Sequence, residues 1–236
     1  RHAGVEGLLR CLRDFLPLQQ RVARAGALSS LSQLLLRLTS PGVPDIYQGN
    51  ETWDFSLVDP DNRRAVDYAA RHAALRAIRA LHDGQGPAAC AQRLIETLQD
   101  GRIKLYLIWK ALALRREHEP LFRDGNYLSL KVQGECAEHV CAFARHHGGK
   151  SLLVAVPRLF DRLMGENDRL PVGACVWEDA WIELPAECMH ETWTNTLTGE
   201  TVGTRIRGGG QELALAQLFK TFPYALLLAQ QAAPDR

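Results

Sequence analysis

The sequence carries almost no net charge, because 28 Lys and Arg residues stand against 27 Asp and Glu residues, for a formal net charge of +1. Such a balance does not create the broad positive field that nucleic acid or an anionic membrane surface requires. The sequence also lacks any run of about 18 consecutive apolar residues, so no segment is predicted to span a bilayer. We therefore expect a small or uncharged partner, and neither nucleic acid nor a membrane.

Metal and redox motifs are missing as well. The six cysteines include no CxxC pair and no His at zinc-site spacing, so no metal site, redox motif or cofactor is predicted. Cys136 and Cys141 are the closest pair, and two small buried residues explain them better than a disulfide. Free thiols and the absence of a signal-type apolar leader favour a cytoplasmic protein. The first residue is Arg1 rather than Met, which we expect of a fragment boundary.

The length and composition indicate a folded protein with two domains. The chain has 236 residues, of which 46% are hydrophobic and 23% charged. Folding is expected to bury roughly 70% of the surface of a chain of this mass, which suffices for a core without disulfides or metal. The pattern of apolar residues changes near residue 120, so we expect a domain boundary there.

Before residue 120 the periodicity is helical, with apolar residues every three or four positions. The first helix should contain Pro17 in its first turn, where proline is tolerated. Between the first two helices, the segment 45–48 is typical of a short buried strand in an α/β fold, because it is apolar and bounded by turn residues. The four predicted helices cover about residues 15–38, 68–84, 88–98 and 103–118.

After residue 120 the alternation has period two, and glycine-rich turns separate the apolar runs. Six short strands of this kind are typical of an antiparallel sandwich, with a hairpin turn at Gly148-Gly149. The predicted strands cover residues 127–132, 139–145, 151–157, 174–184, 191–197 and 224–229.

The most unusual segment is the loop that follows residues 45–48. It runs for about 17 residues without a periodic pattern, and loops of this length inside compact domains tend to be functional. It is rich in acidic, aromatic and Arg side chains. The alternative is a solvated surface loop in which residues 59–62 form a turn.

The residues of this region resemble a known family. The pattern Gly-x-Pro-x-x-Tyr-x-Gly-x-Glu at residues 42–51 is similar to the last barrel strand of the α-amylase superfamily. The run Trp-Asp-Phe-Ser-Leu-Val-Asp-Pro-Asp-Asn-Arg-Arg at residues 53–64 resembles the maltooligosyltrehalose synthases in particular, and residues 100–105 also fit them. Asn50 and Ala65 depart from that pattern without changing a charge.

The resemblance implies both a fold and an activity. Residues 1–120 would be the C-terminal portion of a (β/α)₈ barrel, with its last strand at about 45–48, and residues 121–236 would form an antiparallel β-sandwich domain. The intact enzyme would convert the reducing-end α-1,4 bond of a maltooligosaccharide to α-1,1 by intramolecular transglucosylation. The family's three catalytic carboxylates lie upstream of this stretch, so no catalytic residue is assigned here, and we expect the fragment to be inactive alone.

The resemblance places the loop beside the reducing-end glucose, and sugar chemistry selects its side chains. Carboxylates and amides bind vicinal hydroxyl groups, Arg offers a rigid donor fork, and aromatic rings cover the apolar face of a pyranose. An opposing interpretation is that Arg63 or Arg64 pairs with Asp54 or Asp59 and only fixes the loop shape. Lys104 is a weaker candidate for sugar binding, because a lysine near the start of a helix is usually solvated. The predicted substrate-binding residues are Tyr47, Gln48, Glu51, Trp53, Asp54, Asp61 and Arg63.

Two other functions remain open at this level. One is an α-amylase-type hydrolase or glucanotransferase. Residues 53–64 disfavour it, because they resemble the maltooligosyltrehalose synthases in particular. The other is a non-catalytic glucan-binding or scaffold module, which would need exposed aromatic residues among Trp177, Trp181 and Trp193. An incomplete barrel would expose apolar surface, so we also expect self-association.

Overall fold

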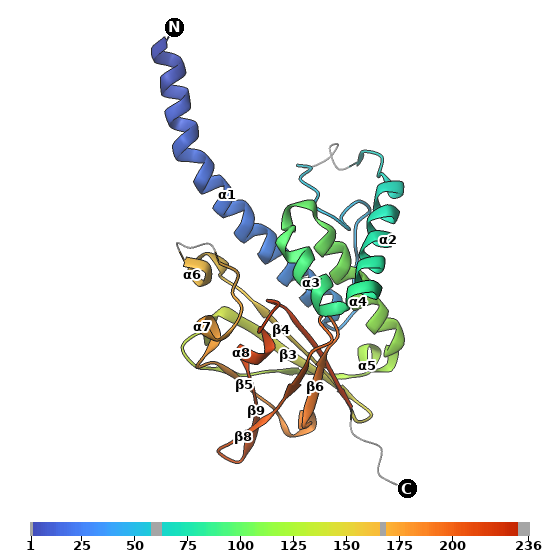
Figure 1. Ribbon diagram of the computed structural model, residues 1–236. Coiled ribbons are helices and arrows are strands. Elements are labelled where there is room, and N and C mark those ends of the chain that lie inside the picture. Colours follow the sequence, from blue (N-terminus) through green and yellow to red (C-terminus); the bar gives the residue numbers. More distant parts are fainter. Residues whose placement is uncertain (1, 58–62, 166–168, 231–236) are drawn as a thin grey trace.

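The computed structural model describes residues 2–57, 63–165 and 169–230 (Figure 1). Its first part is helical, and among the described helices none is long and apolar enough to cross a membrane. The helices are α1 (His2–Thr39), α2 (Tyr68–Gln85), α3 (Pro87–Glu96), α4 (Arg102–Glu117) and α5 (Glu119–Arg123), with a 3₁₀ turn at Leu98–Asp100 between α3 and α4.

Helix α1 is longer than the sequence predicts. It begins at His2 rather than near residue 15, so Pro17 lies in its interior instead of its first turn. The buried face starts only at Leu28 and continues through Leu31, Leu35 and Leu38, all of them fully buried. Further toward the N-terminus the helix projects beyond the other elements (Figure 1). Its exposed apolar side chains there are Leu12, Phe15, Leu16, Leu18 and Val22.

The strand predicted at residues 45–48 is wrong. Residues 43–47 have no regular secondary structure, and a turn follows. A strand needs a neighbouring strand to complete its backbone hydrogen bonds, and none lies beside this segment in the part of the chain that the structure describes. Arg115 of α4 instead holds its beginning, because the guanidinium donates to the carbonyl oxygens of Leu38 and Gly42, each at 2.9 Å.

Two antiparallel sheets make up the second part. The larger has the order β1 (Asn126–Ser129), β3 (Val140–His147), β4 (Lys150–Pro157), β10 (Ala225–Gln230), β6 (Thr192–Asn195) and β7 (Thr201–Gly203). The smaller has the order β2 (Val132–Gln133), β5 (Trp181–Glu183), β9 (Gly210–Ala214) and β8 (Arg205–Arg207). The short helices α6 (Phe160–Met164), α7 (Ala174–Trp177) and α8 (Leu215–Leu218) lie in the connections.

The strand predictions are confirmed at most positions, but the strand predicted over residues 127–132 is divided between β1 and β2, which lie in different sheets. The hairpin turn is confirmed, because Gly148 and Gly149 both have positive φ and join β3 to β4. The strand predicted over residues 174–184 is wrong in its first half, where the chain forms α7 and only then β5. The strands β7, β8 and β9 are not predicted by the sequence pattern.

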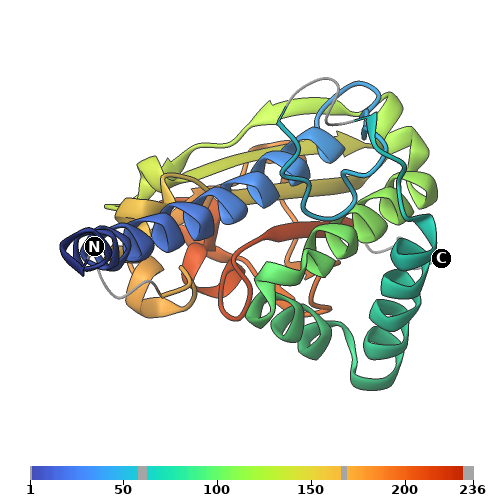
Figure 2. The ribbon, with the colours of Figure 1, turned by 90° about the horizontal axis from the view of Figure 1, so that it is seen from above.

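The central strands of the larger sheet are buried on both faces. Their side chains therefore pack against both the helices of the first part and the smaller sheet of the second part. On β4, Leu152, Val154 and Val156 pack into the core that the helices share, while Leu153 and Ala155 pack into the core between the sheets. Figure 2 shows α1 and α4 lying across one face of the larger sheet. A core therefore crosses the boundary predicted near residue 120.

Candidate functional site

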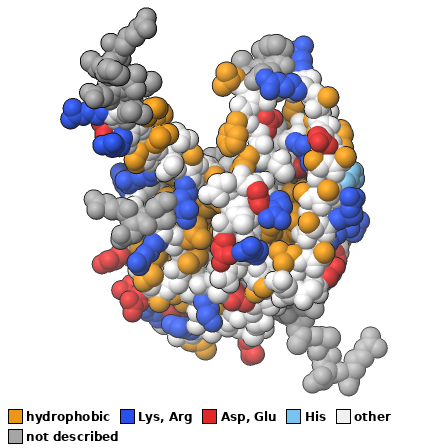
Figure 3. Space-filling model, turned by 45° about the horizontal axis from the view of Figure 1, so that its top comes forward, with side chains coloured by type: hydrophobic (Ala, Val, Ile, Leu, Met, Phe, Trp, Pro, Cys, Tyr) orange, Lys and Arg blue, Asp and Glu red, His pale blue; other side chains and the backbone are white. Residues whose placement is uncertain are grey.

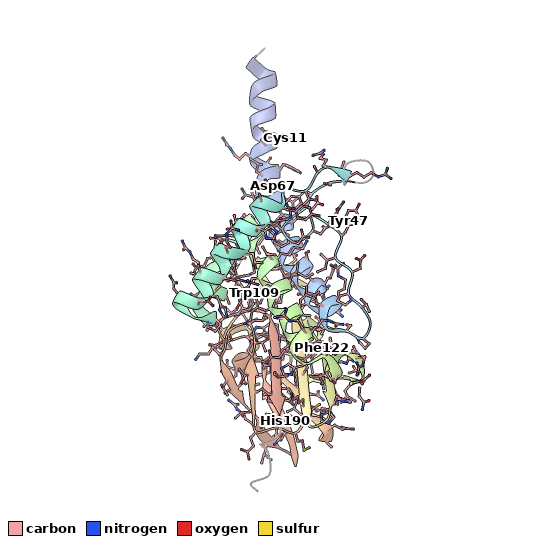
Figure 4. All side chains as sticks on the ribbon, turned by 90° about the vertical axis from the view of Figure 1, so that its right-hand side faces the viewer. Cys11, Tyr47, Asp67, Trp109, Phe122 and His190 are labelled. Carbon is pink, nitrogen blue, oxygen red and sulfur yellow. The ribbon has the colours of Figure 1, made fainter. Side chains whose placement is uncertain are left out.

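The candidate site lies where the loop between α1 and α2 meets the first turn of α2 and the start of α4. Figure 4 shows Tyr47 on this loop and Asp67 at the beginning of α2, both far from His190 at the other end of the sheets. Asp67 begins α2 by accepting a hydrogen bond from the backbone N–H of Ala70 at 2.8 Å. Such an N-terminal cap fixes where the loop ends and the helix starts.

Arg71 of α2 holds the turn at residues 48–51. Its Nε forms an ion pair with Glu51 Oε2 at 2.9 Å, and its two terminal nitrogens donate to the carbonyl oxygens of Gly49 at 2.7 Å and Asp67 at 3.2 Å. Both side chains of the ion pair are largely buried. The carboxylate of Glu51 is therefore engaged within the protein.

Residues 98–104 contact Trp53 and fix its position. Its indole Nε1 donates to the carbonyl oxygen of Leu98 at 2.6 Å. The Lys104 ammonium lies 5.6 Å from the centre of the Trp53 ring and donates to the carbonyl oxygen of Thr52 at 3.2 Å. The indole and the backbone beside it are thus fixed by contacts from an element about fifty residues further along the chain.

Lys104 is not solvated, so that prediction is wrong: only 9% of the residue is exposed. Burial lowers the pKa of its ammonium, and the positive charge of Arg37 adds to this effect. The carboxylates of Asp54 and Glu51 act in the opposite direction but are outweighed. The loop thus packs over a cation that it only partly neutralises.

Gly101 allows the close approach of these two segments. Its φ is +74°, and a Cβ atom at this position would lie 2.8 Å from the backbone nitrogen of Trp53 and 3.1 Å from Cδ1 of its ring. Only glycine accepts both constraints at low cost. The two runs that carry the family resemblance, around residues 53 and 101, therefore meet in space.

Replacing Gly101 by Ala is expected to lower the free energy of unfolding by about 1 to 3 kcal/mol through the left-handed backbone alone. Contact with Trp53 should add to this loss and should shift the tryptophan emission. Gly209→Ala is the matched control, because Gly209 has φ +86° with nothing within 4 Å of its Cβ position. Equal losses in urea denaturation, with unchanged emission, would contradict the contact.

The other predicted side chains lie around the same turn. Tyr47 is about half exposed, and Gln48 accepts a hydrogen bond from the Tyr68 hydroxyl at 3.4 Å. Asp54 is exposed and accepts from the backbone N–H of Ser56 at 2.9 Å, and hydrogen bonding by Ser56 lowers the pKa of the Asp54 carboxyl. Arg63 is exposed, whereas Asp61 lies outside the described residues, as does Asp59.

Two hollows flank the loop on the side of α1. Figure 3 shows the molecule hollowed between α1 and the part of the molecule that carries the loop. The first, of about 300 Å³, is lined by Ser30, Gln33, Arg37, Tyr47, Asn50 and Lys104, among others. The second, of about 520 Å³, combines the aromatic rings of Trp53 and Phe55 with the amides of Gln19, Gln20 and Gln99. Aromatic rings with adjacent amides provide the contacts that sugars require.

The remaining candidate features do not form sites. Trp177 and Trp193 are fully buried and Trp181 is partly buried, so the described residues show no exposed row of tryptophans for a separate glucan-binding face. All six cysteines are free, and Cys136 donates to the carbonyl oxygen of Val176 at 3.4 Å. Over residues 2–57, 63–165 and 169–230, no group of three or more His, Cys, Asp or Glu side chains is arranged to hold a metal ion.

The chain is similar to known proteins over most of its length. It is 37% identical over 203 residues to a protein of Mycobacterium tuberculosis (strain H37Rv) that carries the provisional name maltooligosyl trehalose synthase. The match covers 86% of this chain and 21% of the relative, so the chain spans about a fifth of the length of the curated relatives it matches. No family model matches the chain.

Solved structures give the same result. The structure of maltooligosyltrehalose synthase from Arthrobacter ramosus is 30% identical, with a TM-score of 0.64 over 91% of this chain and 24% of that one. A second maltooligosyl trehalose synthase structure is 27% identical, with a TM-score of 0.61 over 92% of this chain and 24% of that one. The resemblance predicted from residues 42–64 is confirmed: this chain is similar to part of a maltooligosyltrehalose synthase.

Proposed function

We propose that this chain is the C-terminal part of a (1→4)-α-D-glucan 1-α-D-glucosylmutase of the α-amylase superfamily, a cytoplasmic enzyme of trehalose formation. The observation that carries the proposal is the similarity to the Mycobacterium tuberculosis relative over 86% of the chain. In this proposal, residues 1–120 complete a (β/α)₈ barrel with segments outside this sequence, and residues 121–236 form its β-sandwich domain.

In the proposed reaction, a maltooligosyl unit is captured on an enzyme carboxylate and the reducing-end glucose is released. That glucose then turns over and attacks through its 1-hydroxyl to give the α-1,1 bond. Retaining transfer needs a nucleophile and an acid/base about 5 to 5.5 Å apart, which the remainder of the enzyme would supply. Holding the glucose raises its effective concentration over water.

The loop between α1 and α2 would form one wall of the pocket for this glucose. Trp53 offers an aromatic face held by Leu98 and Lys104, and the exposed Asp54 and Arg63 offer an acceptor and a donor fork. Glu51 and Gln48 have protein partners in Arg71 and Tyr68, which supports a shaping role for them. Tyr47 lines the adjoining hollow.

Grafting tests the proposal. We expect a chimera in which this chain replaces the matched part of the Arthrobacter ramosus enzyme to convert maltopentaose to a non-reducing product. Accumulation of glucose and shorter maltooligosaccharides, with no non-reducing product, would indicate a hydrolase instead. The isolated chain should cause no loss of reducing ends, and a heat-sensitive loss would contradict the assignment of the catalytic carboxylates to the remainder.

Self-association stays a prediction. It is supported by the exposed apolar side chains of α1 and by Val43 and Phe55 of the loop, which are 95% and 87% exposed. Light scattering of the isolated chain should show species larger than 26.3 kDa whose share grows with concentration. A strictly monomeric species at every concentration would contradict it.

A further inference from the structure

The smaller hollow beside the loop gathers positive charge without a facing carboxylate. It lies between α1, residues 47–50 and α4, and has a volume of about 300 Å³. Arg37 and Lys104 both line it, and no Asp or Glu side chain does. Two cations that share a hollow repel each other unless an anion lies between them.

Lys104 brings unused donor capacity to this hollow. An ammonium group has three N–H donors, and within the described residues Lys104 donates only to the carbonyl oxygen of Thr52. The residue is nine-tenths buried, so the remaining donors face little bulk water. The nearby carboxylates have other partners, because Glu51 is paired with Arg71 at 2.9 Å and Asp54 accepts from Ser56.

Arg37 completes the cationic lining from the side of α1. Over the ranges that the structure describes, its guanidinium has neither a hydrogen bond nor an ion pair, and the residue is exposed. Gln33 and Ser30 lie four and seven positions before it, hence on the same helix face, and both line the hollow. Asn50 contributes a further amide from the loop.

We propose that this hollow binds a small oxyanion, of the class of phosphate or a carboxylate. The guanidinium is a rigid fork that matches such anions, and the ammonium adds a second charge at a buried position. Neutral amide and hydroxyl donors complete the set. A neutral sugar fits less well, because its hydroxyl groups would find no carboxylate acceptor among the lining side chains. The proposal does not rest on the proposed glucosyl transfer, although Tyr47 lines this hollow as well.

The test is a titration of the purified chain with inorganic phosphate, and separately with acetate, at an ionic strength held constant with sodium chloride. We expect a saturable rise in melting temperature and saturable chemical-shift changes for the amide groups of Arg37 and Asn50. Arg37→Gln and Lys104→Met should each weaken binding at least tenfold. Lys104→Arg keeps the charge and should retain binding within a few-fold.

Arg76→Gln is the matched control, because Arg76 is an exposed Arg on α2 that does not line the hollow. It should leave binding unchanged. Since Arg37 is exposed, its variant reports on binding even if Lys104→Met disturbs the loop. The proposal is overturned by a non-saturable response, by binding that survives Arg37→Gln, or by a response to maltotriose instead of phosphate. None of these outcomes bears on the product of the chimera.

Discussion

Replacing Arg145 by Met is expected to lower the free energy of unfolding by about 3 to 5 kcal/mol, because several charge-assisted hydrogen bonds are lost together. Arg145 lies on β3 and is only 1% exposed. Its guanidinium donates to the carbonyl oxygens of Phe122 at 3.0 Å, Gly125 at 2.8 Å and Asn126 at 3.2 Å. These carbonyl groups lie where α5 ends and β1 begins.

Met has an unbranched apolar side chain that fills much of the same space, so the loss would arise from the unmatched carbonyl groups. Arg205→Met is the matched control, since Arg205 is exposed on β8 and its change should alter stability by no more than about 0.5 kcal/mol. The measurement is the urea midpoint of both variants, with the slope checked for constancy. Similar small losses in the two variants would show that Arg145 is not what holds the junction of helix and strand.

Local periodicity explains what the sequence could predict about the fold. The helices at residues 68–84, 88–98 and 103–118 are confirmed within a few positions, because their apolar spacing repeats over several turns and Gly or Pro marks their ends. The strands 139–145, 151–157 and 224–229 are confirmed for the same reason. They form the centre of the larger sheet, where both faces are buried.

The failures arise where structure depends on distant partners. A four-residue apolar run such as 45–48 becomes a strand only if a neighbouring strand pairs with it, and the sequence does not show whether one does. The strands β7 and β8 have three residues each, and every residue of β8 is exposed, so neither strand is long enough to show a distinct alternation in the sequence. In residues 174–184, the first four residues form the helical turn α7, and the burial of Trp177 at its end is compatible with either a helix or a strand.

The same distinction between local sequence pattern and distant partners applies to the candidate site. The loop and its unusual side chains are visible in the sequence, but the residues that hold it are not. Arg71 follows Glu51 by 20 positions and Lys104 follows Thr52 by 52, and no spacing rule links them. The sequence favours a solvated Lys104 because most lysines are solvated, and only the fold reveals the burial of this residue.

In the chimera, replacing Arg63 by Ala is expected to raise the ratio of hydrolysis to α-1,1 transfer by roughly ten- to a hundredfold. The change corresponds to one charged hydrogen bond of about 1.5 to 3 kcal/mol. The covalent intermediate forms in either case, and the acceptor depends on how long the released glucose stays bound. An exposed guanidinium at the end of the loop can hold that glucose without taking part in bond cleavage.

The opposing interpretation, in which Arg63 only fixes the loop, predicts a different result: a lower melting temperature with an unchanged product ratio. Free glucose and maltooligosyltrehalose should therefore be measured in the same reaction, alongside the melting curve. Arg76→Ala serves as the control, because this exposed Arg lies on the following helix, away from the loop turn. If its ratio rises as much as that of Arg63→Ala, the effect reflects the loss of surface charge, and the loop does not retain the glucose through Arg63.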